Sequence, residues 1–346
     1  LRKKWLETLA IDIFNLIRLN KEVIIVSSGS IALGKKQLSL KNNLTLDEKQ
    51  AAAATGQISL AHAWKEVMIE HGLNVAQILL APDDTETRRK HLNARATLIK
   101  LLELGVIPVI NENDTVSTEE IKFGDNDRLA ARVAQMCSAD LLILLSDING
   151  LYSSDPNKNK NATLIEKVTE ISTEIESMAG PANSKISSGG MVTKIEAAKI
   201  SMNAGCHMII CDGRLDNPLL KLEENEKTFS WFKAKDHPLN LRKQWISGAL
   251  HAKGKIIIDN GATQAIKKGF SILPAGIVKT EGHYEKGDLI KIIDQNETFV
   301  GTGLTHFNNS EVELIKGLKS ENIEKILGYR GKDEVVHRDD LVLEKK

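Results

Sequence analysis

Eight consecutive residues near the middle of the chain combine hydroxyl, glycine and lysine residues in a way that suits a phosphate group. They are Ser187, Ser188, Gly189, Gly190, Met191, Val192, Thr193 and Lys194. Glycine lets backbone N–H groups approach an anion closely, and a helix start offers unpaired N–H donors and a partial positive charge. Lys194, in the first turn of the helix that follows, adds a full charge, so the segment predicts a phosphate site. The spacing is not that of the common P-loop, and the alternatives are a plain glycine-rich turn and a solvated helix lysine.

A second cluster places two carboxylates and an amide at the start of another predicted helix. Its sequence is Phe123-Gly124-Asp125-Asn126-Asp127. One interpretation is a helix N-cap, because Asp and Asn both suit that position. A second is a group that orients lysines and accepts hydrogen bonds from an amino-acid substrate, and a third is metal ligation by carboxylates.

Polar residues also follow directly after apolar runs that predict strands. They are Ser28, Asn111, Asp114, Ser146 and Asp147. In open α/β sheets, ligands bind outside the carboxyl ends of the strands. Asp114 is suited to a substrate ammonium group, and Ser28 beside Gly29 is suited to a carboxylate or phosphate. Ordinary turns would give the same residue types.

Alternating strands and helices must position these groups. Apolar runs at 21–26, 75–80, 106–110, 141–145 and 207–210 predict strands, and amphipathic or alanine-rich stretches at 1–19, 47–71, 93–104, 127–137 and 195–204 predict helices. This order predicts an α/β fold with a mainly parallel sheet sandwiched by helices. We expect this domain to span residues 1–235.

The pattern changes after a polar stretch that contains Pro238, so we expect a linker at 236–250 and a second domain at 251–346. Short apolar runs at 272–278, 289–293, 299–302 and 312–314, separated by glycines, predict strands there. They indicate a small β-rich domain that is a barrel or a sandwich.

Composition excludes several classes of protein. Lys+Arg and Asp+Glu are equal at 46 each, and residues 251–346 hold 15 of each sign, so nothing favours a nucleic-acid or membrane surface. Three cysteines without metal spacing indicate buried thiols in a reducing cytoplasm. The sequence holds no run long enough for a membrane span, no HExxH motif and no Gly-x-Ser-x-Gly elbow.

Taken together, the ordered motifs resemble those of the glutamate 5-kinases in the amino-acid kinase family. The motifs are Ser27-Ser28-Gly29-Ser30-Ile31-Ala32, Asn111-Glu112-Asn113-Asp114, Phe123-Gly124-Asp125-Asn126-Asp127, Ser146-Asp147 and Ser188-Gly189-Gly190-Met191-Val192-Thr193-Lys194. The resemblance covers nearly the whole chain, and the β-rich segment is similar to the PUA domain of many bacterial members.

The resemblance implies transfer of a phosphoryl group from ATP to the γ-carboxylate of L-glutamate, the first step of proline synthesis. It implies glutamate binding by Ser28, Asp114 and Asn126, and nucleotide binding by Ser146-Asp147 and Ser188–Lys194. Lys194 would stabilise the transferred phosphoryl group and Asp127 would organise the lysines, with Mg²⁺ bridging the ATP phosphates. Feedback inhibition by proline and assembly as dimers or tetramers are also implied.

The first residues depart from the family pattern. The family begins with a strand that carries a lysine and a Gly-Ser-Ser turn, whereas this sequence begins at Leu1 inside a predicted helix. We therefore expect that the sequence as given lacks its true N-terminus, that the sheet lacks a strand and so has open backbone groups at its edge or centre, and that the chain as given is a poor catalyst.

Two competing interpretations remain. One is a member of the same family that acts on aspartate, acetylglutamate, carbamate or a nucleotide. The other is an RNA-binding or regulatory protein, because PUA domains elsewhere bind RNA, although the neutral charge of residues 251–346 argues against it.

Overall fold

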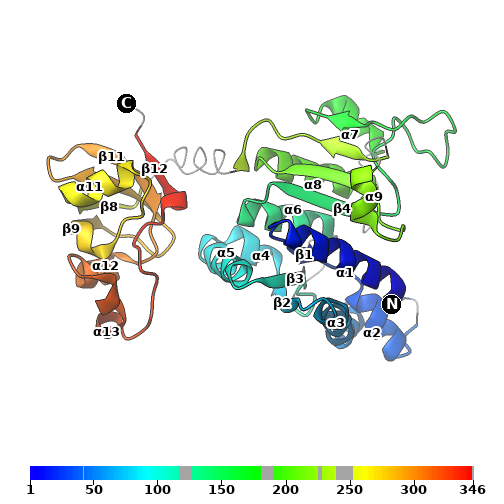
Figure 1. Ribbon diagram of the computed structural model, residues 1–346, viewed down its shortest axis with the longest axis horizontal. Coiled ribbons are helices and arrows are strands. Elements are labelled where there is room, and N and C mark those ends of the chain that lie inside the picture. Colours follow the sequence, from blue (N-terminus) through cyan, green and yellow to red (C-terminus); the bar gives the residue numbers. More distant parts are fainter. Residues whose placement is uncertain (42, 117–125, 181–189, 225–227, 239–251, 345–346) are drawn as a thin grey trace. The chain divides into compact units, whose positions relative to one another are not determined.

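A computed structural model describes residues 1–41, 43–116, 126–180, 190–224, 228–238 and 252–344. The chain divides into two compact units, Leu1–Pro238 and Leu239–Lys346 (Figure 1). The predicted linker falls almost entirely on 239–251, which lies outside the described residues. Each unit is treated by itself below.

The first unit alternates helices with strands. Its helices are α1 (Lys3–Arg18), α2 (Ser30–Gln37), α3 (Leu46–Ile69), α4 (Pro82–Glu86), α5 (Arg88–Glu103), α6 (Asn126–Cys137), α7 (Thr173–Met178), α8 (Met191–Asn203) and α9 (Pro218–Glu224). Its strands are β1 (Ile25–Val26), β2 (Asn74–Leu80), β3 (Val106–Glu112), β4 (Leu141–Ser146), β5 (Lys167–Val168), β6 (His207–Asp212) and β7 (Ser230–Phe232).

These strands form two sheets. One has the order β1-β3-β2 and is parallel throughout, and the other has the order β4-β6-β7-β5. The pairs β4–β6 and β5–β7 are parallel, and β6–β7 is antiparallel. The predicted α/β class with a mainly parallel sheet is therefore confirmed. Strand β3 is buried from Ile107 to Glu112, as a strand covered on both faces must be.

Helix α6 connects the two sheets, because it contacts β1 and β3 of the first sheet and β4 of the second. Leu129 and Val133 pack in one apolar cluster with Ile110 of β3. Ala130 and Ala131, on a different face of the helix, pack in another cluster with strand β6. The buried residues of α6 therefore serve two cores, and its N-terminus is held between the two sheets.

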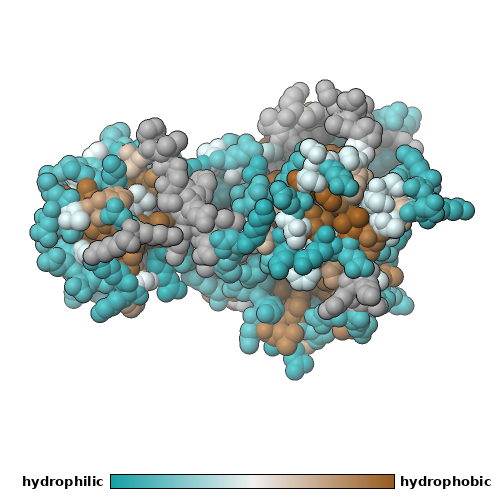
Figure 2. All heavy atoms as spheres, turned by 90° about the horizontal axis from the view of Figure 1, so that it is seen from above, coloured by the Kyte–Doolittle hydropathy of each residue, from teal (hydrophilic) through white to brown (hydrophobic). Residues whose placement is uncertain are grey.

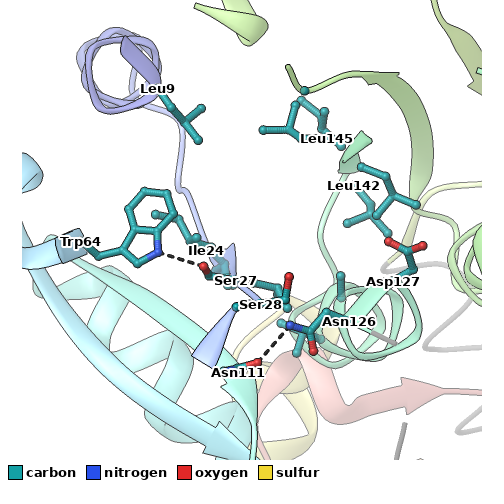
Figure 3. Close-up of a pocket in the computed structure, with 18 of the residues that line it drawn as sticks. Leu9, Ile24, Ser27, Ser28, Trp64, Asn111, Asn126, Asp127, Leu142 and Leu145 are labelled. Atoms are coloured by element: carbon teal, nitrogen blue, oxygen red, sulfur yellow. Dashed lines mark hydrogen bonds between the residues drawn. The ribbon is translucent and has the colours of Figure 1, made fainter. Parts of the chain in front are cut away.

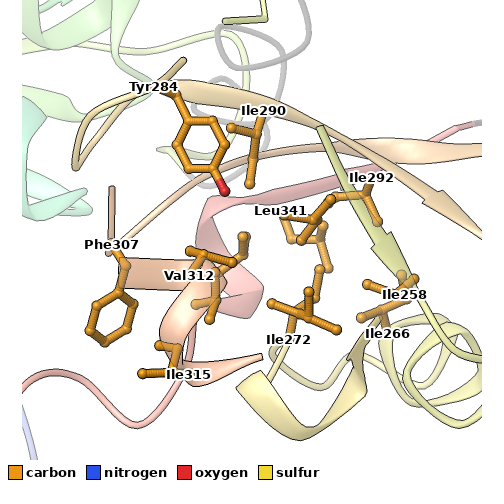
Figure 4. Close-up of a cluster of buried hydrophobic side chains, with 14 of the residues drawn as sticks. Ile258, Ile266, Ile272, Tyr284, Ile290, Ile292, Phe307, Val312, Ile315 and Leu341 are labelled. Atoms are coloured by element: carbon orange, nitrogen blue, oxygen red, sulfur yellow. The ribbon is translucent and has the colours of Figure 1, made fainter. Parts of the chain in front are cut away.

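The second unit is a five-stranded, mostly antiparallel sheet with short helices. Its strands are β8 (Gly254–Ile258), β9 (Ile277–Gly282), β10 (Leu289–Asp294), β11 (Phe299–Leu304) and β12 (Leu341–Leu343), and its helices are α11 (Asn260–Lys267), α12 (Asn309–Ile315) and α13 (Ile323–Leu327). The strand order is β12-β11-β10-β8-β9. Figure 4 shows its core, in which Ile292, Phe307 and Val312 point into one buried cluster.

Two predictions for this unit were wrong in detail. Residues 312–314 were expected to form a strand, but they lie in α12, because Asn308 and Glu311 form a capping box that starts the helix. The predicted strand at 272–278 contains a 3₁₀ turn at Pro274–Gly276, and β9 begins only at Ile277. Proline cannot donate to a strand ladder, which explains the interruption.

The surface is mixed in character. Figure 2 shows mostly hydrophilic residues, interrupted by patches of apolar residues on both units. Exposed apolar side chains include Ile58 of α3 and Phe270 in the second unit. Such scattered residues are normal on a soluble fold and carry no conclusion by themselves.

Candidate active site

The residues that the sequence places after strands line one cavity of about 1900 Å³ in the first unit. Its wall includes the three residues that the motifs assigned to glutamate, the aspartate assigned to the lysines and the Ser146-Asp147 pair: Ser28, Asp114, Asn126, Asp127, Ser146 and Asp147. Figure 3 shows Ser28, Asn126 and Asp127 around this space. The convergence that the kinase interpretation requires is therefore present in the fold.

Ser28 is presented by a tight turn between β1 and α2. The preceding hydroxyl, Ser27 Oγ, accepts a hydrogen bond of 2.9 Å from Trp64 Nε1 of α3 (Figure 3). The chain then turns at Gly29, whose φ of +113° is a conformation that residues with a side chain rarely adopt. Ser28 is left exposed at the cavity wall, at the start of a helix.

Helices α2 and α3 cross at a very short separation beside this turn. A Cβ added at Gly34 would lie 1.8 Å from the Ala52 carbonyl oxygen, and one added at Gly56 would lie 1.9 Å from the Ser30 carbonyl oxygen. Only glycine permits such an approach of two backbones. The crossing holds Ser30, and with it the Ser28 turn, in a fixed position on α3.

Asn111 connects this crossing to the start of α6. It was expected in a turn after the strand but lies in β3, with 3% of its surface exposed. Its Nδ2 donates to Gln57 Oε1 at 2.9 Å and to Ser30 Oγ at 3.2 Å. Its Oδ1 accepts from Asn126 Nδ2 at 2.9 Å. Asn126, assigned to glutamate, is therefore held by a buried amide rather than by a flexible loop.

Asp127 and Lys194 form an ion pair across two helices. Lys194 Nζ lies 2.9 Å from Asp127 Oδ2, and their side chains are 12% and 17% exposed. Thr193 Oγ1 lies 3.4 Å from Asp127 Oδ2 and donates its one hydrogen to the Gly190 carbonyl oxygen at 2.8 Å, while Gly190 N donates to Thr193 Oγ1 at 3.2 Å. The N-terminal turns of α6 and α8 thus meet through a carboxylate, a hydroxyl and an ammonium group.

The two neighbouring residues at the start of α6 face different parts of the site. Asn126 hydrogen-bonds to Asn111 on the side of the first sheet, whereas Asp127 bonds to Lys194 of α8. Successive helical side chains differ in direction by about 100° because the helix has 3.6 residues per turn. Asn126 and Asp127 are therefore neighbours in the sequence, but their side chains contact different elements.

A further group lies at the carboxyl ends of β4 and β6. Ser146 is buried and its Oγ donates to Asp147 Oδ1 at 3.2 Å, while Gly213 N donates to the Ser146 carbonyl oxygen at 2.7 Å. Arg214 also lines the cavity and bonds to Asp212 through Nε at 2.9 Å and Nη2 at 2.7 Å. The bond to Arg214 lowers the pKa of Asp212 below its ordinary value.

Sequence reasoning missed Arg214 and Gln57. Arg214 follows a predicted strand in the sequence Asp212-Gly213-Arg214, so its place at the carboxyl end of β6 was a usable signal. Gln57 gave no local signal, because it lies in the middle of an alanine-rich helix.

Part of the cavity is apolar. It runs between β1 and β4, where Leu9 of α1 and Leu145 of β4 contribute to the wall (Figure 3). Among the described residues, β1 pairs with β3 and β4 pairs with β6, and neither has a second strand partner. Within the described part of the chain, one edge of β1 and one edge of β4 therefore border the site.

Part of the predicted phosphate segment cannot be placed. Ser188 and Gly189, like Phe123, Gly124 and Asp125, lie outside the described residues. The rest of the segment begins α8: Gly190 is its N-cap residue and Met191, Val192, Thr193 and Lys194 form its first turn. None of these five described residues lines the cavity, but Lys194 contacts Asp127, which does.

Two of the three cysteines are buried away from the cavity, whereas Cys137 lines it. Cys206 and Cys211 are buried, as predicted, and Cys137 is partly buried. Burial raises the pKa of both buried thiols to about 12, so neither is a thiolate near neutral pH. In the part of the chain that the structure describes, no group of three His, Cys, Asp or Glu residues could hold a metal ion.

Comparison with known proteins identifies the family. A model of the amino acid kinase family matches residues 2–212. The chain belongs to the amino acid kinase family. A PUA domain model also matches residues 254–327, which confirms the expectation for the second unit.

This amino acid kinase is similar to glutamate 5-kinases over nearly its whole length. A glutamate 5-kinase of Paramagnetospirillum magneticum is 52% identical over 343 residues, which cover 99% of this chain and 92% of the relative. One of Rhodospirillum rubrum is 51% identical over 346 residues, which cover 100% and 92%. A crystal structure of an isopentenyl phosphate kinase substrate complex matches 65% of this chain and 90% of that chain, at 16% identity and a TM-score of 0.43.

No helix within the described residues is both long and apolar enough to cross a membrane.

Proposed function

We propose that this amino acid kinase transfers the γ-phosphoryl group of ATP to the γ-carboxylate of L-glutamate, which gives γ-glutamyl phosphate and ADP. The observation that carries the proposal is the contact of Asp127 with Lys194, one residue from Asn126, in a cavity also lined by Ser28 and Asp114. The 52% identity to a curated glutamate 5-kinase supports the choice of substrate.

The reaction makes modest demands on the protein. The γ-carboxylate, with an ordinary pKa of about 4.3, is ionised at neutral pH and needs no general base. One of its oxygens attacks the γ-phosphorus in line, and the bond from phosphorus to the β,γ-bridging oxygen breaks, so that the electron pair leaves on ADP. The protein must hold the two anions together and offset their charge.

Positive charge for this purpose comes from the start of α8. Lys194 supplies an ammonium group, and the free N–H groups of the first helical turn supply a partial positive charge. Asp127 keeps the lysine from moving away when no nucleotide is bound. Mg²⁺, which arrives with ATP, neutralises phosphate charge when it is bound, and the carboxylates of Asp127 and Asp147 are oxygen ligands of the kind that it prefers.

The amino-acid end of glutamate requires the opposite charges. Asp114 offers a carboxylate to the α-ammonium group, and Asn126 offers its amide oxygen. Ser28 offers a hydroxyl to one of the carboxylates at the start of α2. The Ser146-Asp147 pair and the first turn of α8 remain for the nucleotide. This division keeps glutamate on the side of the first sheet and ATP on the side of the second.

A substrate panel tests the proposal. ADP release is followed with L-glutamate, L-aspartate, N-acetyl-L-glutamate, carbamate and UMP as acceptors, each at saturating MgATP. We expect turnover with L-glutamate at least 100-fold above that with the other acceptors. Turnover confined to a different acceptor would overturn the assignment and leave the family intact.

Two regulatory features belong to the same proposal. We infer inhibition by proline, which shares the α-ammonium and α-carboxylate of glutamate, and assembly as a homo-oligomer. Proline titration at subsaturating glutamate and sedimentation velocity measure them. Turnover unaffected by 100-fold excess proline, or sedimentation as a monomer at micromolar concentration, would contradict the respective inference.

A further inference from the structure

The buried side chain of Asn111 has its whole hydrogen-bonding capacity in use. Its two N–H groups go to Gln57 Oε1 and Ser30 Oγ, and its Oδ1 accepts from Asn126 Nδ2 and from the Glu112 backbone N–H, the last at 2.9 Å. A side-chain amide offers two donors and an oxygen with two lone pairs, so all four positions are filled.

This pattern permits one orientation of the amide. If the Asn111 amide turned over, its NH₂ group would face the donors of Asn126 and Glu112, and its oxygen would face Gln57 Oε1. Two donor pairs and one acceptor pair would then face each other, and leaving buried polar groups without a partner is unfavourable. Of the two acceptors that Asn111 Nδ2 contacts, Gln57 Oε1 lies closer, at 2.9 Å against 3.2 Å for Ser30 Oγ.

The orientation of Asn111 in turn decides that of Asn126. Because Asn111 presents an oxygen, Asn126 must direct its Nδ2 towards β3, as the dashed line in Figure 3 shows. The oxygen of the same planar amide is then turned away from Asn111, at a residue that lines the cavity. An amide oxygen there can accept a hydrogen bond from an ammonium group, whereas an NH₂ group would repel it.

We propose that Gln57 is a positioning residue that determines recognition of the substrate's α-ammonium group. It acts through Asn111 on Asn126, across two hydrogen bonds, and does not touch the substrate. Gln57 is suited to this role because it is 8% exposed and follows Gly56, at which α3 is fixed against α2. The inference rests on the proposed function, because it takes the amino-acid substrate to lie at Asn126.

The test compares the binding of two ligands that differ only in the α-ammonium group. L-Glutamate and glutarate have the same two carboxylates, but glutarate has no α-ammonium group. Titration calorimetry on the full chain gives the Kd of each ligand and of MgATP. Gln57→Leu should raise the Kd of glutamate about tenfold or more, the scale of a lost hydrogen bond to a charged group. The Kd values of glutarate and MgATP should stay within about threefold.

Two further variants separate positioning from folding. Gln57→Glu keeps an acceptor oxygen for Asn111 Nδ2, so it should retain the preference for glutamate over glutarate within about threefold. Gln37→Leu is the matched control, because Gln37 Nε2 donates to Ser59 Oγ at 2.7 Å and also joins α2 to α3, at a place that does not line the cavity. It should leave the preference unchanged.

Several results would overturn the inference. An unchanged preference in Gln57→Leu would do so, and so would equal losses of glutamate and glutarate, which indicate a general structural role. If Gln57→Leu does not fold, Ser30→Ala removes the other acceptor of Asn111 Nδ2 and must reduce the preference, by about threefold. Glutamate binding by the unaltered chain tests the proposed function, whereas only the change of preference among the variants tests the role of Gln57.

Discussion

Replacing Lys194 with methionine should remove most of the activity and little of the stability. The Nζ–Oδ2 distance of 2.9 Å to Asp127 corresponds to a Coulomb attraction of about 6 kcal/mol at an effective dielectric constant near 20, before the cost of desolvating the ions. A phosphoryl oxygen at the same distance would gain as much. When the lysine is removed, water restores part of this attraction to the phosphoryl oxygen. We therefore expect kcat to fall by about 10²–10³, as is typical when a charge-stabilising donor is lost.

The folded protein should tolerate the same change. Both partners retain some exposure, at 12% and 17%, so water can solvate part of the Asp127 carboxylate that remains. We therefore expect a decrease in unfolding free energy of about 1 kcal/mol, the upper end for pairs open to solvent. For a unit of this size that lowers Tm by roughly 2–4 °C.

The assay is coupled ADP release at saturating glutamate and MgATP, with Tm measured in parallel. Lys199→Met is the matched control, because Lys199 lies on the same helix and pairs with Glu176 at 2.6 Å outside the cavity. Its kcat should equal that of the unaltered chain. A kcat for Lys194→Met within threefold of that control would refute the role assigned to the lysine.

Other predictions follow from the packing and from the shifted pKa values. Gly56→Ala should lower the unfolding free energy by about 1–3 kcal/mol, because the new Cβ would lie 1.9 Å from the Ser30 carbonyl oxygen; urea denaturation checks this, and an unchanged midpoint would contradict the close crossing. Arg214→Met should lower Tm at pH 7, and the difference should shrink below about pH 4: Arg214 lowers the pKa of Asp212, so the stabilisation is present above the unfolded pKa and lost as pH falls. A Tm difference independent of pH would argue against that pair. Cys206, with a pKa raised to about 12 by burial, should resist iodoacetamide at pH 8 until guanidinium unfolds the chain; mass spectrometry detects the adduct, and early labelling would show that the thiol is accessible.

Most residues of the candidate site could be proposed from the sequence, because they lie in short local motifs. Lys194 and Asp127 were each identifiable from residue type and position at a helix start. Their contact at 2.9 Å joins residues 67 positions apart, and it followed once both helices were placed on one sheet system. The parallel fold itself supplies this convergence, because the carboxyl ends of its strands share one edge.

What the sequence did not reveal depends on contacts between distant segments. Gln57 and Asn111 are 54 positions apart, and nothing in the neighbourhood of either residue indicates the other. The error at Val312–Leu314 had a different cause. A short apolar stretch in a region punctuated by glycines suggested a strand, while the capping box of Asn308 and Glu311, readable in the sequence, specified a helix.

The adjacency of Asn126 and Asp127 has a consequence for how the reactants are aligned. Their Cα atoms are joined by one peptide unit, which fixes a separation of about 3.8 Å. In the proposed reaction, covalent geometry therefore sets the spacing between the residue that would contact glutamate and the residue that holds Lys194. A single residue inserted between them would rotate one side chain by about 100° about the helix axis. That would separate two tasks that now share a single turn of α6.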